Sequence, residues 1–356
     1  MLRTSDLLYQ AFISCSLCVY LFRTTDGNKW NYDDDTILGP SRWAENYPSC
    51  GGQSQSPVAF WRDEVIVASN MSDLDLSEYR NTIPSEKLLL RNNGHTVQID
   101  IPDDVAIKIN GGNLPDWYRI AQFHFHWGEH DEEGAEHYIG GIAYPLILHI
   151  VNIRRGLHLE RTLNSENDLA VIAVGFHVIT TGATCMNRGE LSEENNPELE
   201  KIVTQLRDVM FKGDEVLIAD KMTLINLVPQ DYSNFFRYQG SLTTPPCWES
   251  VIWTVLVNTI PVSIEQLHRF REIFSTKRGL DLPAHMRGNF RPIQSLNGRT
   301  VQVRFPVNDL RIGPVDLAGS GAACLHSLKA VFQYGCCVYQ FFVVIAVWAI
   351  IYEKTQ

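Results

Sequence analysis

The chain has 356 residues, of which 45% are hydrophobic and 20% are charged. This ordinary globular composition excludes a wholly disordered chain, a collagen and a polytopic membrane protein. The formal net charge of −11 argues against nucleic acid or anionic lipid as the main partner.

The N-terminal segment has the features of a secretory signal peptide. Arg3 precedes an uncharged, mostly apolar stretch at residues 7–22, and a polar run follows at residues 23–27. A basic start followed by an apolar centre is typical of such peptides. We therefore expect a signal peptide over residues 1–25; an uncleaved anchor or a buried helix is the alternative.

The middle of the chain, residues 26–318, reads as one β-dominated α+β domain without internal repeats. Runs rich in β-branched and aromatic residues alternate with turn residues such as Asn92-Asn93-Gly94, which is typical of strands joined by turns. The expected strands cover residues 64–68, 96–101, 105–109, 119–127, 146–152, 170–179, 216–219, 251–258 and 301–305. Many strands and few helices predict this fold class.

Two helices are expected in the second half of the domain. The first covers residues 196–209 and has Pro197 in its first turn. The second covers residues 263–274, where Ser263 and Gln266 have the spacing of a capping box.

Three histidines form a candidate metal centre. His124 and His126 alternate with aromatic residues, so in a strand both imidazoles point to the same face. His149 lies inside a second apolar run, where a lone imidazole is unfavourable without a partner. Three histidines from neighbouring strands, with a fourth position open, are a ligand set of catalytic zinc. For the first pair alone, a chance surface or core arrangement is the alternative.

Two further segments could serve such a centre. Glu136-His137 lies between the two histidine-bearing runs, and a proline-stiffened loop at residues 241–247 carries Thr243 beside the apolar Leu242. A threonine hydroxyl accepts a hydrogen bond more readily when its own proton is taken by a buried carboxylate. A turn or a structural hydrogen bond is the alternative for each segment.

The eight cysteines fit an oxidising compartment. Cys50 and Cys247 are candidates for a long-range disulfide, although sequence alone leaves the pairing open and two free thiols remain possible. Cys185 is left over, or pairs with Cys324. The only glycosylation sequon begins at Asn70, which we expect to be exposed if it is used.

The C-terminal segment, residues 319–356, is expected to attach the protein to a membrane. Small residues cluster at 318–323, a spacer follows, and residues 330–352 are uncharged. This order matches a glycosylphosphatidylinositol anchor signal, which we favour over a single membrane span of the same residues. Either interpretation places the folded domain on the extracellular face of the plasma membrane.

These residues together resemble the α-class carbonic anhydrases, in particular the secreted and membrane-anchored members. The resemblance covers about residues 30–305 and rests on separated motifs in the family's order. The motifs are Ser54-Gln55-Ser56-Pro57, Asn93-Gly94-His95, residues 122–128, Glu136-His137, His149, residues 242–246, Trp253 and Asn289-Phe290-Arg291-Pro292. It implies one domain with a large twisted, mostly antiparallel central sheet, a few peripheral helices and zinc in a conical cleft.

The resemblance assigns roles to individual residues. His124, His126 and His149 correspond to the zinc ligands, and Thr243 corresponds to the residue that orients the hydroxide, with Glu136 as its proton acceptor. The proton shuttle corresponds to His95, whose ring we expect to be mobile and to face solvent. The remaining matches are Thr244 near bicarbonate, an apolar CO2 wall of Val151, Val171, Leu242, Val251 and Trp253, and the Cys50–Cys247 disulfide.

The implied function is reversible hydration of CO2 to bicarbonate and a proton at the cell surface, through attack by a zinc hydroxide. Its cofactor is Zn2+, and its partners are CO2, bicarbonate and the membrane, without nucleic acid; the oligomeric state stays open. The alternative is a non-catalytic binding or adhesion ectodomain. Relatives of that kind usually lack a ligand histidine, whereas all three are present here.

Two positions depart from the family pattern. Ile147 stands where the family usually has a glutamate that accepts a hydrogen bond from the third ligand, and isoleucine offers no acceptor. We therefore expect zinc to be held more loosely. Asn31 replaces a glycine of the family, which makes Tyr32 a less certain member of the solvent network.

Overall fold

The computed structural model describes residues 30–134, 136–158, 163–178 and 195–304. The expected signal peptide, the expected C-terminal anchor signal, Cys185 and Cys324 lie outside the described residues. Within the described part of the chain, no helix is both long enough and apolar enough to cross a membrane.

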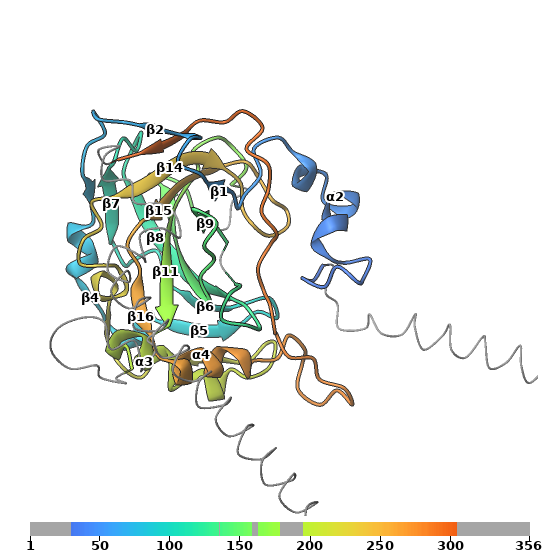
Figure 1. The fold of residues 1–356 in the computed structure, drawn as a ribbon. Coiled ribbons are helices and arrows are strands. Elements are labelled where there is room, and N and C mark those ends of the chain that lie inside the picture. Colours follow the sequence, from blue (N-terminus) through green and yellow to red (C-terminus); the bar gives the residue numbers. More distant parts are fainter. Residues whose placement is uncertain (1–29, 135, 159–162, 179–194, 305–356) are drawn as a thin grey trace, which may run out of the picture.

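A large twisted sheet dominates the described residues (Figure 1). It has 13 strands among them, in the order β12-β5-β6-β8-β10-β11-β15-β14-β17-β2, with β16, β3 and β7 attached at its sides. The strands are β2 (Val65–Val67), β3 (Leu74–Asp75), β5 (Leu89–Asn92), β6 (Val97–Asp100), β7 (Lys108–Gly111), β8 (Tyr118–Trp127), β10 (Leu146–Arg154), β11 (Leu169–Val178), β12 (Glu215–Leu217), β14 (Phe235–Gly240), β15 (Val251–Leu256), β16 (Ile260–Val262) and β17 (Val301–Val303).

Most strand pairs in this sheet are antiparallel, as expected. The parallel pairs are β11 with β15, β11 with β16, and β17 with β2. Two small two-stranded sheets pair β1 (Ala59–Phe60) with β9 (Tyr138–Ile139) and β4 (Thr82–Ile83) with β13 (Met222–Thr223). The expected α+β class with one β-dominated domain is confirmed.

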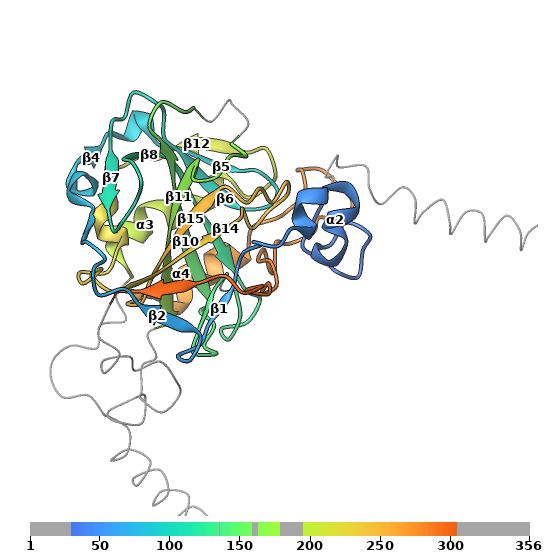
Figure 2. The ribbon, with the colours of Figure 1, turned by 90° about the horizontal axis from the view of Figure 1, so that it is seen from above.

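The α-helices of the described residues are short and peripheral. They are α2 (Trp43–Asn46), α3 (Pro197–Val203) and α4 (Ile264–Arg271). Figure 1 and Figure 2 show α2 on a different side of the sheet from α3 and α4. The predicted capping box of α4 is present, because the Ser263 hydroxyl accepts from the backbone N–H of Gln266 and the Gln266 side chain accepts in return.

Some predicted boundaries are wrong. The helix predicted at residues 196–209 ends at Val203, and a separate 3-10 turn follows at Leu206–Asp208. The strand predicted from residue 105 begins only at Lys108, because the backbone at Val105 and Ile107 makes turn hydrogen bonds instead. The six residues of β14 were not predicted as a strand at all.

The central strands bury apolar side chains on both faces of the sheet. Phe123, Phe125 and Trp127 of β8 pack on the face that carries the larger core. Ile147 and Val151 of β10 belong to a second core on the opposite face. Alternation along β8 turns His124 and His126 toward that second face, so the fold itself separates the imidazoles from the phenyl rings.

Candidate metal centre

The three histidines lie on two adjacent central strands. In the register of β8 against β10, His149 stands directly opposite His124, and Ile147 stands opposite His126. The ring centroids lie 4.7–5.4 Å apart. One nitrogen from each ring can be chosen so that all three lie within 4.8 Å of one another. The backbone pairing therefore brings together the three residues predicted as ligands.

Two of the rings are oriented by acceptors on their outer nitrogens. Nδ1 of His124 lies 2.8 Å from Oε1 of Gln122, and Nδ1 of His126 lies 2.6 Å from the backbone oxygen of Asn289. These contacts leave Nε2 of both rings for a metal. Nε2 of His126 is buried and has no hydrogen-bond partner among the described residues, which fits a nitrogen that serves as a metal ligand.

Burial keeps all three imidazoles neutral. Desolvation lowers the pKa of His126 to about 4, and it holds the pKa values of His124 and His149 well below the ordinary value. Neighbouring histidines lower the pKa values of His124 and His149 further. Only the neutral imidazole can bind a metal. The donor set and its protonation therefore fit zinc, for which three histidines are an established catalytic set.

The third ring lacks an outer acceptor. Nε2 of His149 is buried without a partner among the described residues, and Nδ1 lies 3.9 Å from Oε2 of Glu136, beyond hydrogen-bonding distance. Ile147, two residues earlier on the same strand face, is 2% exposed and apolar. The missing hydrogen-bond acceptor for His149 is what we expect from isoleucine at position 147.

Glu136 is a fully buried carboxyl group beside the histidines. Its Oε1 accepts a 2.8 Å hydrogen bond from the backbone N–H of Arg291 and lies 3.3 Å from Nδ1 of His126. Burial raises the pKa of Glu136 to about 8, while the Thr243 hydroxyl and Arg291 oppose the shift. The influence of the Thr243 hydroxyl places it near this carboxyl group, and its role in orienting a nucleophile stays a prediction.

The Thr243 loop is fixed from several sides. Cys247 forms a disulfide with Cys50, 197 residues earlier in the chain. The backbone N–H of Leu242 donates to the oxygen of Trp248, and the N–H of Cys247 donates to the oxygen of Thr244. These bonds fix the loop that carries Thr243, which is 5% exposed, and Thr244, which is half-buried.

The predicted apolar wall forms next to the third histidine. Val151 of β10 faces Val171 of β11, and Val171 in turn faces Trp253 of β15. The Trp253 ring lies 4.8 Å from the His149 ring. Val251 is buried in the same core, and Leu242 packs against it while partly exposed. The wall therefore spans three neighbouring strands and the Thr243 loop.

His95 differs from the sequence-based expectation. Its ring is half-buried and stacks on the Trp30 ring, with centroids 3.6 Å apart and planes 11° apart. Burial, with a smaller contribution from Lys212, lowers its pKa to about 4. The expectation of a solvent-facing ring is therefore wrong for this conformation. Tyr32, in the same aromatic group, has a buried hydroxyl without a partner among the described residues.

Arg291 is a functional residue that sequence reasoning did not assign. Its guanidinium donates to Oε1 of Gln55 and to the backbone oxygens of Ser56 and Cys50, and its N–H holds Glu136. Arg291 thus ties the disulfide region to the buried Glu136 carboxyl group. Its position inside a family motif was the only available signal, because the contacts join residues more than 150 positions apart.

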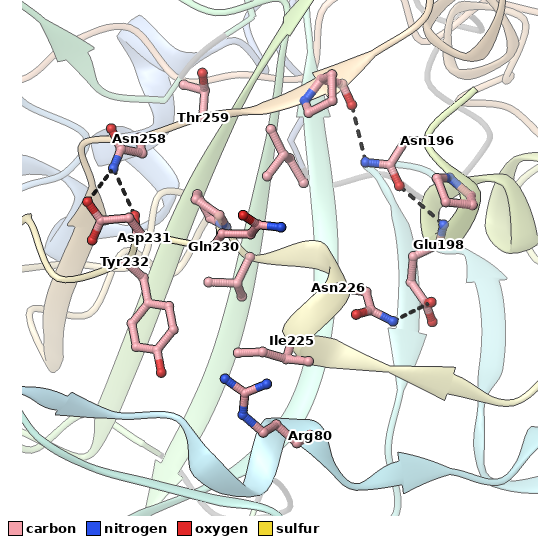
Figure 3. A pocket seen from close by; sticks show the side chains of 15 residues that line it. Arg80, Asn196, Glu198, Ile225, Asn226, Gln230, Asp231, Tyr232, Asn258 and Thr259 are labelled. Carbon is pink, nitrogen blue, oxygen red and sulfur yellow. Dashed lines mark hydrogen bonds between the residues drawn. The ribbon is translucent and has the colours of Figure 1, made fainter. Parts of the chain in front are cut away.

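A separate surface pocket is shown in Figure 3. None of the three histidines lines it. Its carboxylates already have partners, since Glu198 accepts from Asn226 and Asp231 accepts from Asn258. The histidine cluster is therefore the candidate site.

Comparisons with known proteins agree with this geometry. Residues 38–305 match the family model of the eukaryotic-type carbonic anhydrases. Human carbonic anhydrase 12 is 32% identical over 91% of this chain and 84% of its own length. Human carbonic anhydrase 7 is 34% identical over 79% and 99%, and mouse carbonic anhydrase 6 is 32% identical over 78% and 81%.

Proposed function

Because the chain belongs to the eukaryotic-type carbonic anhydrase family, we propose that it reversibly hydrates CO2 to bicarbonate and a proton with zinc bound by His124, His126 and His149. The observation that carries this proposal is the convergence of three neutral, buried imidazoles on two paired central strands. When bound there, zinc supplies the Lewis acidity that makes water a nucleophile near neutral pH.

The residues around the centre position the nucleophile and the substrate. Thr243 accepts a hydrogen bond from the nucleophile when its own hydroxyl proton is directed to Glu136. The wall formed by Val151, Val171 and Trp253 excludes water and offers CO2 an apolar surface without a strong bond. Positioning of this kind contributes to rate because the reacting atoms are already aligned.

One proton must leave the site in each turnover, and His95 is the proposed carrier. The stacked conformation on Trp30 disfavours the charged ring, since burial lowers its pKa. We infer that His95 must leave this conformation to carry protons efficiently near neutral pH, where a carrier with a pKa near about 6.5 works best.

The decisive experiment combines metal analysis with a CO2 hydration assay on the purified protein. We expect one zinc per chain, loss of hydration when a chelator removes the metal, and recovery when zinc is added. A metal-replete protein without hydration activity would instead favour the non-catalytic binding ectodomain.

A second experiment tests the role proposed for Thr243. Thr243→Val removes the hydroxyl at nearly constant volume, and we expect hydration to fall about 100-fold from lost alignment, with zinc content unchanged. Thr243→Ser retains the hydroxyl and should keep most of the activity. Equal activity of the valine variant and the natural protein would remove Thr243 from the mechanism.

We also propose an extracellular location with a lipid anchor. The Cys50–Cys247 disulfide supports an oxidising compartment, and the small-residue cluster and apolar C-terminal tail support the anchor. Phosphatidylinositol-specific phospholipase should release the protein from intact cells. Retention after this treatment would favour the single membrane span.

A further inference from the structure

Arg237 of β14 is a buried cation without a hydrogen-bond partner. Its side chain lies on the sheet face opposite the histidines, and the residue is 7% exposed. Among the described residues, Nε, Nη1 and Nη2 all lack a partner. Arg291, which is comparably buried, donates to three oxygens. The lack of hydrogen-bond partners at Arg237 is therefore not shared by every buried arginine in the described part of the chain.

A second unpartnered polar group lies beside it. Thr254 of β15 stands directly opposite Arg237 in the antiparallel register, so both side chains project from the same face. Thr254 is 1% exposed, and its Oγ1 also lacks a partner among the described residues. The neighbouring positions of β14 and β15 can be followed in Figure 1.

The groups around the Arg237 guanidinium are mainly apolar, and no carboxylate among the described residues pairs with it. Its carbon lies 5.4 Å from the centre of the Phe235 ring. At Gly112, an added Cβ would come within 2.9 Å of Nη2 and 3.2 Å of the Phe235 ring. Among the described residues, no carboxylate forms an ion pair with Arg237, although the nearby Arg304 is paired with Asp73.

The charge persists at neutral pH. Burial lowers the pKa of Arg237 to about 10, and the nearby Tyr118 opposes this shift. Tyr118 is itself neutral at this pH, because burial raises its pKa to about 12, and its hydroxyl donates to the backbone oxygen of Asn167. Arg237 is thus a buried cation that the surrounding side chains do not neutralise, an arrangement that is strongly unfavourable on its own.

We propose that the Arg237 guanidinium and the Thr254 hydroxyl bind a small monovalent anion of the halide class on the back of the sheet. Both groups can donate, and a single negative charge neutralises the guanidinium. Phosphate or sulfate would bring a second negative charge that the single guanidinium does not neutralise. The apolar contact with Phe235 suits a weakly hydrated ion. The site is independent of the zinc centre and of the proposed catalytic function.

Thermal unfolding at constant ionic strength tests the proposal with chloride as the probe. Replacing gluconate, a much larger organic anion, by chloride should raise the Tm of the natural protein by about 2–4 °C. Arg237→Met should abolish this rise, and Thr254→Val should reduce it. Arg304→Met, which removes a neighbouring arginine that already has a carboxylate partner, should retain it.

An equal chloride response in the natural protein and in Arg237→Met would overturn the proposal, as would the absence of any response in the natural protein. If Arg237→Met does not fold, crystals of the natural protein soaked in bromide provide the second measurement. We expect an anomalous bromide peak between Arg237 and Thr254. Water at that position, without an anomalous signal, would show that solvent alone satisfies the two side chains.

Discussion

Ile147 is the residue at which we expect this carbonic anhydrase to depart most clearly from the pattern of its family. The side chain is buried beside the metal centre, and the outer nitrogen of His149 has no acceptor among the described residues. The rings of His124 and His126 are both oriented by oxygen acceptors. Among the described residues, one of the three proposed ligands is therefore held by packing alone.

We predict that Ile147→Glu slows zinc release by about 10–100-fold, because the new carboxylate would accept from His149 and fix its ring. Transfer of zinc to a coloured chelator measures the rate independently of catalysis. Ile147→Val is the matched control, since it introduces no acceptor and should release zinc at the natural rate. Release from the glutamate variant at that same rate would contradict the argument.

The His95 ring stacks on Trp30 and is half-buried. Because burial lowers its pKa to about 4 from an ordinary 6.5, the unfolded chain binds more protons between these pH values. The stability linked to the neutral ring is present above pH 6.5 and is lost as the pH falls through 4.

We predict that Trp30→Ala raises the pKa of His95 by exposing its ring. Titration of the imidazole proton resonances by NMR measures the shift directly. An unchanged His95 titration would show that burial by Trp30 is not the cause.

At the scale of elements, the disulfide connects the start of the domain to the Thr243 loop. The bond closes a loop of 197 residues, and the loop-closure entropy of that length corresponds to about 5 kcal/mol of stability. We predict a loss of this order in the free energy of unfolding for the Cys50→Ser, Cys247→Ser double variant, measured by denaturant titration. A loss below 1 kcal/mol would mean that Arg291 and the local hydrogen bonds already hold this region.

The sequence predicted most long elements but not their pairing. Apolar runs and alternation indicated β8, β10, β11 and β15, and capping chemistry indicated the start of α4. The strand β14 was missed because Arg237 interrupts its apolar run, and residue type alone does not reveal that this arginine is buried.

At the metal centre too, the residue pattern could be predicted from the sequence, but the pairing of the strands could not. The pattern of His124 and His126 predicts a shared face, but the register that puts His149 opposite His124 depends on the whole sheet. The Trp30–His95 stack and the contacts of Arg291 depend on loops that meet only after folding. Resemblance to a family predicted the ligand role of His149 and the shuttle role of His95, whereas the contacts of Arg291 were not predicted.

At the scale of the whole molecule, backbone pairing of β8 with β10 sets the positions of the three histidines. We predict that zinc removal leaves the far-ultraviolet circular dichroism nearly unchanged and lowers the Tm. Zinc at a thousandfold excess over its Kd should add about 4 kcal/mol of stability. Magnesium, which prefers oxygen ligands, is the control and should not restore the Tm. A chain that loses its sheet on chelation would refute a preformed centre.

The central position of β8 and β10 in the sheet limits local opening of the backbone around the histidines. Strand β8 is flanked by β6 and β10, and β10 is flanked by β8 and β11. Amide protons beside the three ligands are therefore shielded on both sides and should exchange with deuterium only when the entire domain opens. The strands at the edges of the sheet can open and close locally while the three histidines keep their relative positions.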